Sequence, residues 1–253
     1  MDSSPRDFAE NLLPDHFLRD IFEVMLIAWE SVVVPDWNTN EPRITALWNI
    51  QCREVNKMFA EFGPIFDFFH EAQENDPETG KQLCRKDIEV RLYVGRGFTH
   101  IKYGSTARNA PYLIVESKKL SNNSDITEYL GSKGMGRFTE CRYESDKAFS
   151  AMAGYIQPEQ DEAIKQALVK CLNESQTVRQ IGKFQLWSIL PQYPGHGKTR
   201  HKIGDDEMDI FHLMLPTTVQ TQESRNFERM AEETKKQAGK KKRLPKNKRN
   251  DGE

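Results

Sequence analysis

Apolar positions recur at helical spacing in two stretches near the start of the chain. The first covers residues 15–34, and Pro35 ends it because proline cannot continue a helix. The second begins at Glu41, with Asn40 as the N-cap and Pro42 in the first turn. We therefore expect two amphipathic helices. The second has a predicted buried stripe of Ile44, Leu47, Trp48, Val55, Met58 and Phe59.

The spacing then changes from helical to alternating. Residues 74–80 are turn-forming, and residues 88–94 alternate apolar and polar side chains, which is typical of a strand. Residues 112–115 form an unbroken apolar run, which is typical of a central strand buried on both faces. The remaining predicted elements are a strand at Thr99–Tyr103, a glycine-rich loop at Gly131–Gly136, helices at Lys147–Ile156 and Glu159–Leu172, and strands at Phe184–Leu190 and Asp209–Leu215.

These elements predict an α/β fold with a mixed central sheet flanked by helices. We expect residues 1–39 to be an N-terminal helical extension, residues 40–216 to be the main domain, and residues 217–253 to be a tail. The length of 253 residues is enough for one well-buried domain with such appendages.

The formal net charge of −2 hides an asymmetry between the tail and the rest of the chain. Residues 235–253 hold nine Lys or Arg against Asp251 and Glu253, a charge of +7, so the remainder carries −9. A like-charged run without aromatic residues repels itself, and we expect the tail to be disordered. It would serve either as a solubilising segment or as a non-specific contact with phosphates.

The composition excludes several classes of protein. No segment resembles a signal peptide, and no apolar stretch approaches the roughly 20 residues that span a bilayer, so we expect a cytoplasmic protein without membrane contact. The four cysteines are widely spaced and lack a C-x-x-C pair, which favours reduced thiols over a zinc site or disulfides.

The strongest chemical signal is Glu116-Ser117-Lys118, directly after the apolar run. Residues two apart on a strand face the same side, so a carboxylate and an ammonium would stand side by side. Phosphodiester hydrolysis uses such a pair, an oxygen ligand for Mg²⁺ and a cation near the attacking water or the phosphate. The same pattern at Glu233 lies in the polar tail and follows no strand.

Three further acids that bear on the site precede this pair along the chain. Asp87 stands where the alternating strand starts, and a hairpin to the next strand would bring it to Glu116. Glu89 is a rival ligand on the same strand face, and a solvated acid is the alternative interpretation of Asp87. Glu41 begins a helix, where the helix dipole favours an acid whatever its function.

The order of these elements resembles the PD-(D/E)XK nuclease superfamily: an early helical Glu, an Asp-Ile pair opening a strand, then an apolar run followed by Glu-x-Lys. Residues 129–155 and 211–215 also resemble later segments of prokaryotic members. The chain departs from the pattern in Lys86, where a proline often stands, and in a long gap with an insertion around residues 95–109.

The resemblance implies a restriction-endonuclease-like fold and a Mg²⁺ (or Mn²⁺) site. In it, Asp87, Glu116 and the carbonyl of Ser117 hold the metal, Lys118 orients the water, and Glu41 is an accessory acid. We expect the nucleic acid to be contacted by Arg85, Lys86, Lys119, Arg137 and Tyr143, with Lys102 and Arg108 flanking the groove.

The function that the resemblance implies is metal-dependent hydrolysis of DNA, in restriction or antiphage defence. Two alternatives stay open: a catalytically silent nuclease-fold subunit that binds nucleic acid or a partner protein in a defence complex, and an RNA-cleaving toxin. The oligomeric state, including a homo-oligomer, is also open.

Other segments only partly match known functional motifs. Residues 194–199 lack the first glycine of a phosphate-binding loop, and we predict an exposed loop there that contacts nucleic acid through Lys198, Arg200 and Lys202. His196 and His201 are expected to be surface histidines rather than metal ligands. No G-x-S-x-G or H-E-x-x-H motif occurs.

Overall fold

The computed structural model of the chain describes residues 15–59, 66–75, 82–92, 113–140, 149–174, 179–187 and 191–220. Residues 1–218 form one compact unit, and residues 219–253 form a second, of which only 219 and 220 are described. Several predicted features lie outside the described residues: Tyr143, Lys102, Arg108, the strand at 99–103, the insertion at 95–109, and the basic tail from residue 221 onward.

A seven-stranded mixed sheet forms the centre of the first unit, in the order β2-β3-β4-β5-β8-β7-β6. The pairs β4–β5 and β5–β8 are parallel, and the other neighbours are antiparallel. The expected mixed α/β architecture is confirmed. The strands are β2 (Phe66–Asn75), β3 (Gln82–Leu92), β4 (Leu113–Leu120), β5 (Phe149–Ile156), β6 (Gln185–Leu186), β7 (Gly197–Ile203) and β8 (Asp206–Pro216).

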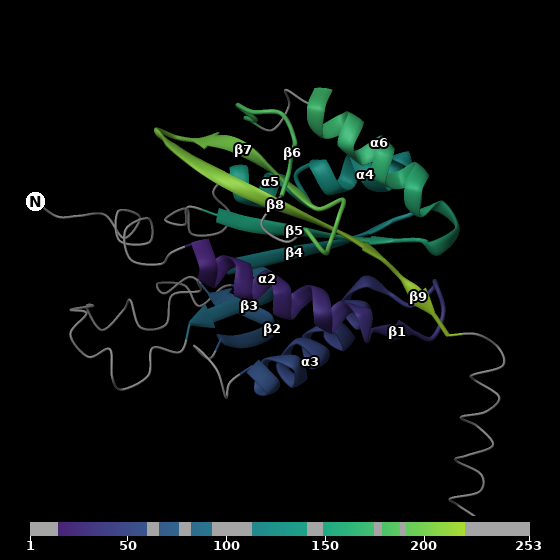
Figure 1. The fold of residues 1–253 in the computed structure, drawn as a ribbon. Helices are drawn as coiled ribbons and strands as arrows, with labels where there is room; N and C mark the ends of the chain where they lie inside the picture. The colour runs from purple at the N-terminus through teal and green to yellow at the C-terminus, as the bar shows by residue number, and fades with distance from the viewer. Residues whose placement is uncertain are drawn as a thin grey trace, which may run out of the picture. The chain divides into compact units, whose positions relative to one another are not determined.

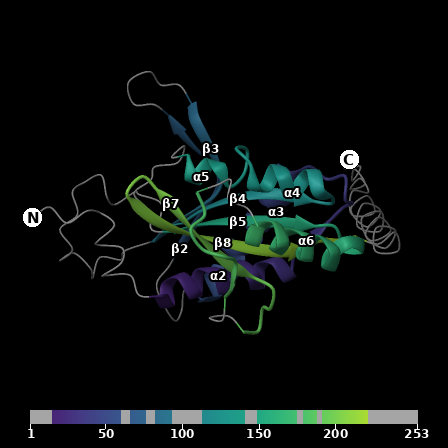
Figure 2. The same cartoon turned by 90° about the horizontal axis from the view of Figure 1, so that it is seen from above.

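Helices cover both faces of this sheet (Figure 1). On one face α2 (Asp15–Glu30) packs against α3 (Glu41–Phe59), and α3 contacts β2, β3 and β4. The other face carries α4 (Asn123–Leu130), α5 (Gly136–Thr139) and α6 (Asp161–Glu174), which follows a short 3-10 turn at Pro158–Gln160. Figure 2 shows α4 and α6 lying side by side over the sheet. None of the described helices combines the length and apolar character needed to traverse a bilayer.

Each face of the sheet has its own apolar core. On the α2–α3 face, the ring of Trp29 stacks on Tyr155 at 5.1 Å between centroids, and Trp48 meets both rings edge-on. On the other face, α4 and α6 bury Ile126, Tyr129, Ile164, Leu168 and Leu172 against Met152 and Met214 of the sheet. The strands between two apolar layers are buried on both sides, as the run at residues 113–115 predicts.

The helix predicted at residues 147–156 is wrong, because Phe149–Ile156 is the strand β5. Its segment is rich in Ala, Met and Gly rather than β-branched residues, so local propensity indicated a helix. The two neighbouring strands override that propensity, since β5 is paired with β8 along its whole length and with β4 from Ala151 to Ile156.

The exposed loop predicted around residues 194–199 is also wrong from Gly197 onward. Gly197–Ile203 is the strand β7, and it alternates buried and less buried positions between β6 and β8. The two histidines predicted at the surface are buried: His196 is 8% exposed and His201 is fully buried.

Two element boundaries and part of one buried stripe differ from the predictions. Helix α2 ends at Glu30, and Val33–Val34 form the strand β1, which belongs to a separate two-stranded sheet with β9 (Thr218–Val219). Strand β2 continues to Asn75, into the predicted turn. On α3 the predicted stripe is buried at Ile44, Trp48 and Val55, but Met58 is 63% and Phe59 40% exposed, since they lie on the last turn, beyond the apolar cover.

Candidate active site

The hairpin partners β3 and β4 bring the two predicted metal-ligand carboxylates together. Ile88 pairs with Val115 in an antiparallel register, so continuing that register by one residue sets Asp87 across from Glu116. These two side chains then share one face of the sheet, and Ile88 and Val115 share the other. Asp87 Oδ2 accepts a hydrogen bond of 2.7 Å from the backbone N–H of Ser117. The two acids, far apart in sequence, are therefore neighbours.

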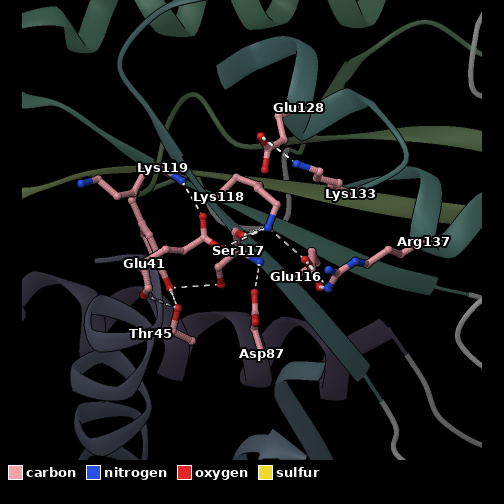
Figure 3. A network of polar contacts seen from close by, with 11 residues as sticks. Glu41, Thr45, Asp87, Glu116, Ser117, Lys118, Lys119, Glu128, Lys133 and Arg137 are labelled. Carbon is pink, nitrogen blue, oxygen red and sulfur yellow. Dashed lines mark hydrogen bonds and ion pairs between the residues drawn. The ribbon is translucent and has the colours of Figure 1, made fainter. Parts of the chain in front are cut away.

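The ammonium group of Lys118 contacts three oxygen atoms (Figure 3). Its Nζ atom lies 3.1 Å from Glu116 Oε1, 3.1 Å from Glu41 Oε1 and 2.8 Å from the carbonyl oxygen of Ser117. Lys118 is 8% exposed, so little water competes for these contacts. The predicted pair of Glu116 and Lys118 on one strand face thus meets in space.

The first turn of α3 delivers Glu41 to the same point. Asn40 caps the helix as predicted, because its Oδ1 accepts a hydrogen bond from the Arg43 N–H at 3.0 Å. Glu41 Oε2 accepts from the backbone N–H of Lys119 at 3.1 Å, while Oε1 holds Lys118. One carboxylate therefore joins the start of α3 to the end of β4.

A buried chain of hydroxyl groups ties α3 to β4 from the other face. The Tyr155 hydroxyl of β5 donates a hydrogen bond to Ser117 Oγ at 3.1 Å. The Tyr155 hydroxyl oxygen also lies 2.9 Å from Thr45 Oγ1. Thr45 in turn donates to the backbone carbonyl of Glu41 at 3.0 Å. The turn that carries Glu41 is thereby linked to the backbone stretch that carries Glu116 and Lys118.

Arg137 of α5 lies on the carboxylate of Glu116. Its Nη1 atom is 2.7 Å from Glu116 Oε1 and 2.9 Å from Oε2, so a single nitrogen contacts both oxygens. The glycine-rich turn before α5 sets this position: Gly134 approaches the carbonyl of Tyr129 so closely that a Cβ atom there would lie 2.2 Å from it. The predicted role of Arg137 was contact with phosphate, and the structure places it on Glu116.

Burial and charge shift the pKa values of three groups in this cluster. Burial raises the pKa of Asp87 from its usual 3.8 to about 6, and the negative charge of Glu116 adds to the rise. Burial also raises the pKa of Glu41, against the opposing effect of Lys118. For Lys118, burial lowers the pKa, but Glu116, Glu41 and Asp87 outweigh it and keep the pKa above its usual value.

The cluster holds three carboxylates, Glu41, Asp87 and Glu116, against two cations, Lys118 and Arg137. Within the described ranges, no three His, Cys, Asp or Glu side chains form a ready-made metal centre. However, Asp87 and Glu116 offer hard oxygen donors, and burial together with the nearby charge of Glu116 raises the pKa of Asp87. This donor set fits Mg²⁺ or Mn²⁺, with the Ser117 carbonyl as the third oxygen.

The other predicted residues take different positions. Glu89, the rival ligand, is 2% exposed and pairs with Lys86 (3.3 Å) and with Arg91. Lys86 is thus buried in an ion pair. Lys119 directs its Nζ to the carbonyl of Thr39 (3.1 Å) and over the Trp37 ring (4.4 Å). Arg85 lies in β3, and its side chain is outside the described part of the structure.

The sequence did not single out Thr45 or Tyr155 as members of the site. Thr45 carries a signal in retrospect, since it lies one helical turn after Glu41 and therefore on the same helix face. Tyr155 carries none, because its segment was predicted to be a helix.

No family model, curated protein or solved structure matches this chain. The geometry above and the resemblance of its motifs are therefore the basis for a function.

Proposed function

We propose that this chain is a metal-dependent nuclease that hydrolyses phosphodiester bonds of DNA, using Mg²⁺ or Mn²⁺. The observation that carries the proposal is the convergence of Asp87, Glu116 and Lys118 from two neighbouring strands, with Glu41 joining them from a helix. The four residues are those that the motif pattern selects. Their setting in restriction or antiphage defence, and the choice of DNA, rest on the resemblance alone.

In this proposal Asp87, Glu116 and the Ser117 carbonyl hold the metal. A bound divalent ion supplies Lewis acidity at the phosphate and a water of lowered pKa. Lys118 stays protonated at neutral pH, because its pKa is raised, so it orients water and offsets negative charge on the phosphate but does not accept a proton. Glu41 keeps Lys118 in place and, with its raised pKa, is the accessory acid.

A second candidate function is a nuclease-fold subunit without turnover. The observation in its favour is that both cations of the cluster already lie on Glu116, at 2.7 and 3.1 Å. In such a subunit these ion pairs would be purely structural. The two functions differ in one respect that can be measured, the hydrolysis of nucleic acid in the presence of a divalent metal.

A cleavage assay on supercoiled, linear and single-stranded DNA and on RNA, each with Mg²⁺ or Mn²⁺, tests the proposal. The Glu116→Gln and Lys118→Met variants should lose roughly a hundredfold or more in rate. Glu128→Gln is the matched control, because Glu128 is a nearby exposed acid paired only loosely with Lys133 at 3.9 Å. Equal cleavage by the parent and both site variants would refute the assignment, and an inert parent on every substrate would favour the silent subunit.

A further inference from the structure

Arg137 lies on the carboxylate that would hold the metal ion of the proposed site. The Nη1 atom of Arg137 spans Glu116 Oε1 and Oε2 at 2.7 and 2.9 Å, and Glu116 is fully buried. A divalent ion held by this carboxylate would have to share its oxygens with the guanidinium. The guanidinium partly neutralises the negative charge that would attract the ion and covers the oxygens that would hold it, so the two cations would compete for Glu116.

The site has two cations on Glu116, and they are not equally held. Lys118 has three oxygen partners, and its side chain is 10% exposed. Arg137 has a 31% exposed side chain and stands on α5, a helix of only four residues that follows the glycine-rich turn. Arg137 therefore borders solvent, and its long side chain can leave the carboxylate without dismantling a strand.

We infer that Arg137 is the counter-cation of Glu116 in the metal-free site and moves off the carboxylate when a divalent ion binds. This inference rests on the proposed function, because it assumes that Glu116 is a metal ligand. The net charge of this cluster agrees with the exchange. Its three carboxylates against Lys118 and Arg137 give −1, and replacing Arg137 by a divalent ion gives zero. The exchange keeps the buried cluster close to neutral.

The displaced guanidinium then becomes available to a phosphate. A guanidinium matches phosphate oxygens in geometry and charge, and Arg137 lies beside the carboxylate proposed to hold the metal. Arg137 would thus couple the two ligands: metal binding frees the group that contacts nucleic acid, and without metal that group stays on Glu116. The site would bind substrate phosphate well only after it has bound metal.

The direct test is Mn²⁺ affinity of the full-length chain without nucleic acid, measured by titration calorimetry. Removing a competitor strengthens binding, so Arg137→Ala should bind Mn²⁺ roughly tenfold more tightly, the factor expected for one lost charge-assisted contact. Lys133→Ala is the matched control: it removes one positive charge from the same segment, but Lys133 contacts Glu128 and not Glu116, so its affinity should change little. Weaker or unchanged Mn²⁺ binding by Arg137→Ala would overturn the inference.

A second measurement follows the side chain itself. The Nε–H resonance of Arg137, assigned by its absence in Arg137→Lys, should shift toward the position of an exposed arginine as Mg²⁺ is added. A resonance unchanged at saturating Mg²⁺ would also overturn the inference. This readout stays decisive if Arg137→Ala is too unstable to titrate.

Glu116→Gln separates this inference from the proposed function. If this variant loses Mn²⁺ binding while Arg137→Ala matches the parent, Glu116 is a metal ligand and only the role of Arg137 is refuted. If the parent and Glu116→Gln bind Mn²⁺ equally, or neither binds, the metal site itself is refuted and the inference falls with it.

Discussion

The ionised carboxylate of Asp87 is disfavoured by its buried position and by the nearby charge of Glu116. Its carboxylate accepts one hydrogen bond, from the Ser117 N–H, and lies close to the negative charge of Glu116 in a buried setting. A structural acid would be paired more fully, as Asp209 is with Lys198 (2.6 Å) and Arg200 (2.7 Å). Strongly shifted pKa values of this kind cluster at functional sites.

Replacing Asp87 by Asn should therefore stabilise the protein at neutral pH. The folded pKa of about 6 lies above the usual 3.8, so between these values the folded state binds a proton that the unfolded state has released. The free energy of unfolding contributed by Asp87 falls as pH rises through this window, and the penalty is complete above it. Urea denaturation should show Asp87→Asn more stable than the parent at pH 7.5 and similar to it at pH 4.

Asp209→Asn is the control with the opposite sign. Burial raises the pKa of Asp209, but its hydrogen bonds and ion pairs with Arg200 and Lys198 outweigh burial and hold the pKa below its usual value. Its stabilising effect is present at neutral pH and lost as pH falls, so Asp209→Asn should be less stable than the parent at pH 7.5. Destabilisation by both substitutions at pH 7.5 would contradict our account of Asp87.

The hydroxyl chain between α3 and β4 gives a prediction about elements rather than single side chains. Tyr155→Phe removes the hydroxyl that lies between Thr45 and Ser117, and it should lower the free energy of unfolding by roughly 1–3 kcal/mol. Cleavage should fall as well, because the turn of α3 that carries Glu41 loses its tie to β4. Thermal denaturation and the cleavage assay together measure the two effects.

Tyr129→Phe is matched to this variant in residue type and burial. The Tyr129 hydroxyl is also fully buried, but it contacts His212 Nδ1 (3.0 Å) and the Met152 carbonyl (3.3 Å), away from the acids of the site. It should lose comparable stability and keep its cleavage rate. Equal activity in both variants would mean that the Tyr155 hydroxyl has only a structural role.

The turn between α4 and α5 provides a sharper test of how an element positions a side chain. In Gly134→Ala the new Cβ would lie 2.2 Å from the backbone carbonyl of Tyr129, so the turn must open and α5 must shift with Arg137. We expect a clear loss of thermal stability. Gly182→Ala is the control, because its Cβ would make only an ordinary contact at 3.7 Å with Arg200, and a similar loss there would contradict the steric argument.

The pattern of the sequence predicted elements well where local and long-range preferences agree. Helix α3 starts at Glu41 behind its Asn40 cap as expected, and the apolar run before Glu116 is a central strand. Strand β5 was missed because its Ala, Met and Gly residues have low strand propensity, and its pairing with the strands on either side makes it a strand. Strand β7 was missed because Pro194 and Gly195 indicated a loop that in fact ends at His196.

The same division applies to the candidate site. Glu116 and Lys118 could be placed together from their spacing on one strand, and Asp87 from a hairpin. The contact of Arg137 with Glu116 could not be predicted from the sequence, since it depends on how a turn folds over the sheet. Tyr155 lies on a strand that the pattern did not reveal.

The uneven charge of the chain leads to a prediction about the molecule's long-range behaviour. Residues 235–253 carry +7 and the remainder −9, so an acidic body approaching DNA would be repelled without the basic segment. Truncation after Gln220 should weaken DNA binding and flatten its salt dependence, by roughly 0.9 in the log–log slope for each lost phosphate contact. Fluorescence anisotropy at several salt concentrations measures both, and an unchanged slope would rule out a role of the tail in binding.

The central place of β5 has a consequence for incomplete chains. Its partner β8 begins only at Asp206, so a polypeptide that stops short of that point leaves one side of β5 without hydrogen bonds. Bare strand edges recruit other strands, and non-local pairing of this kind forms slowly. A prematurely terminated product would thus contain every acid of the candidate site and still expose a strand edge that favours aggregation.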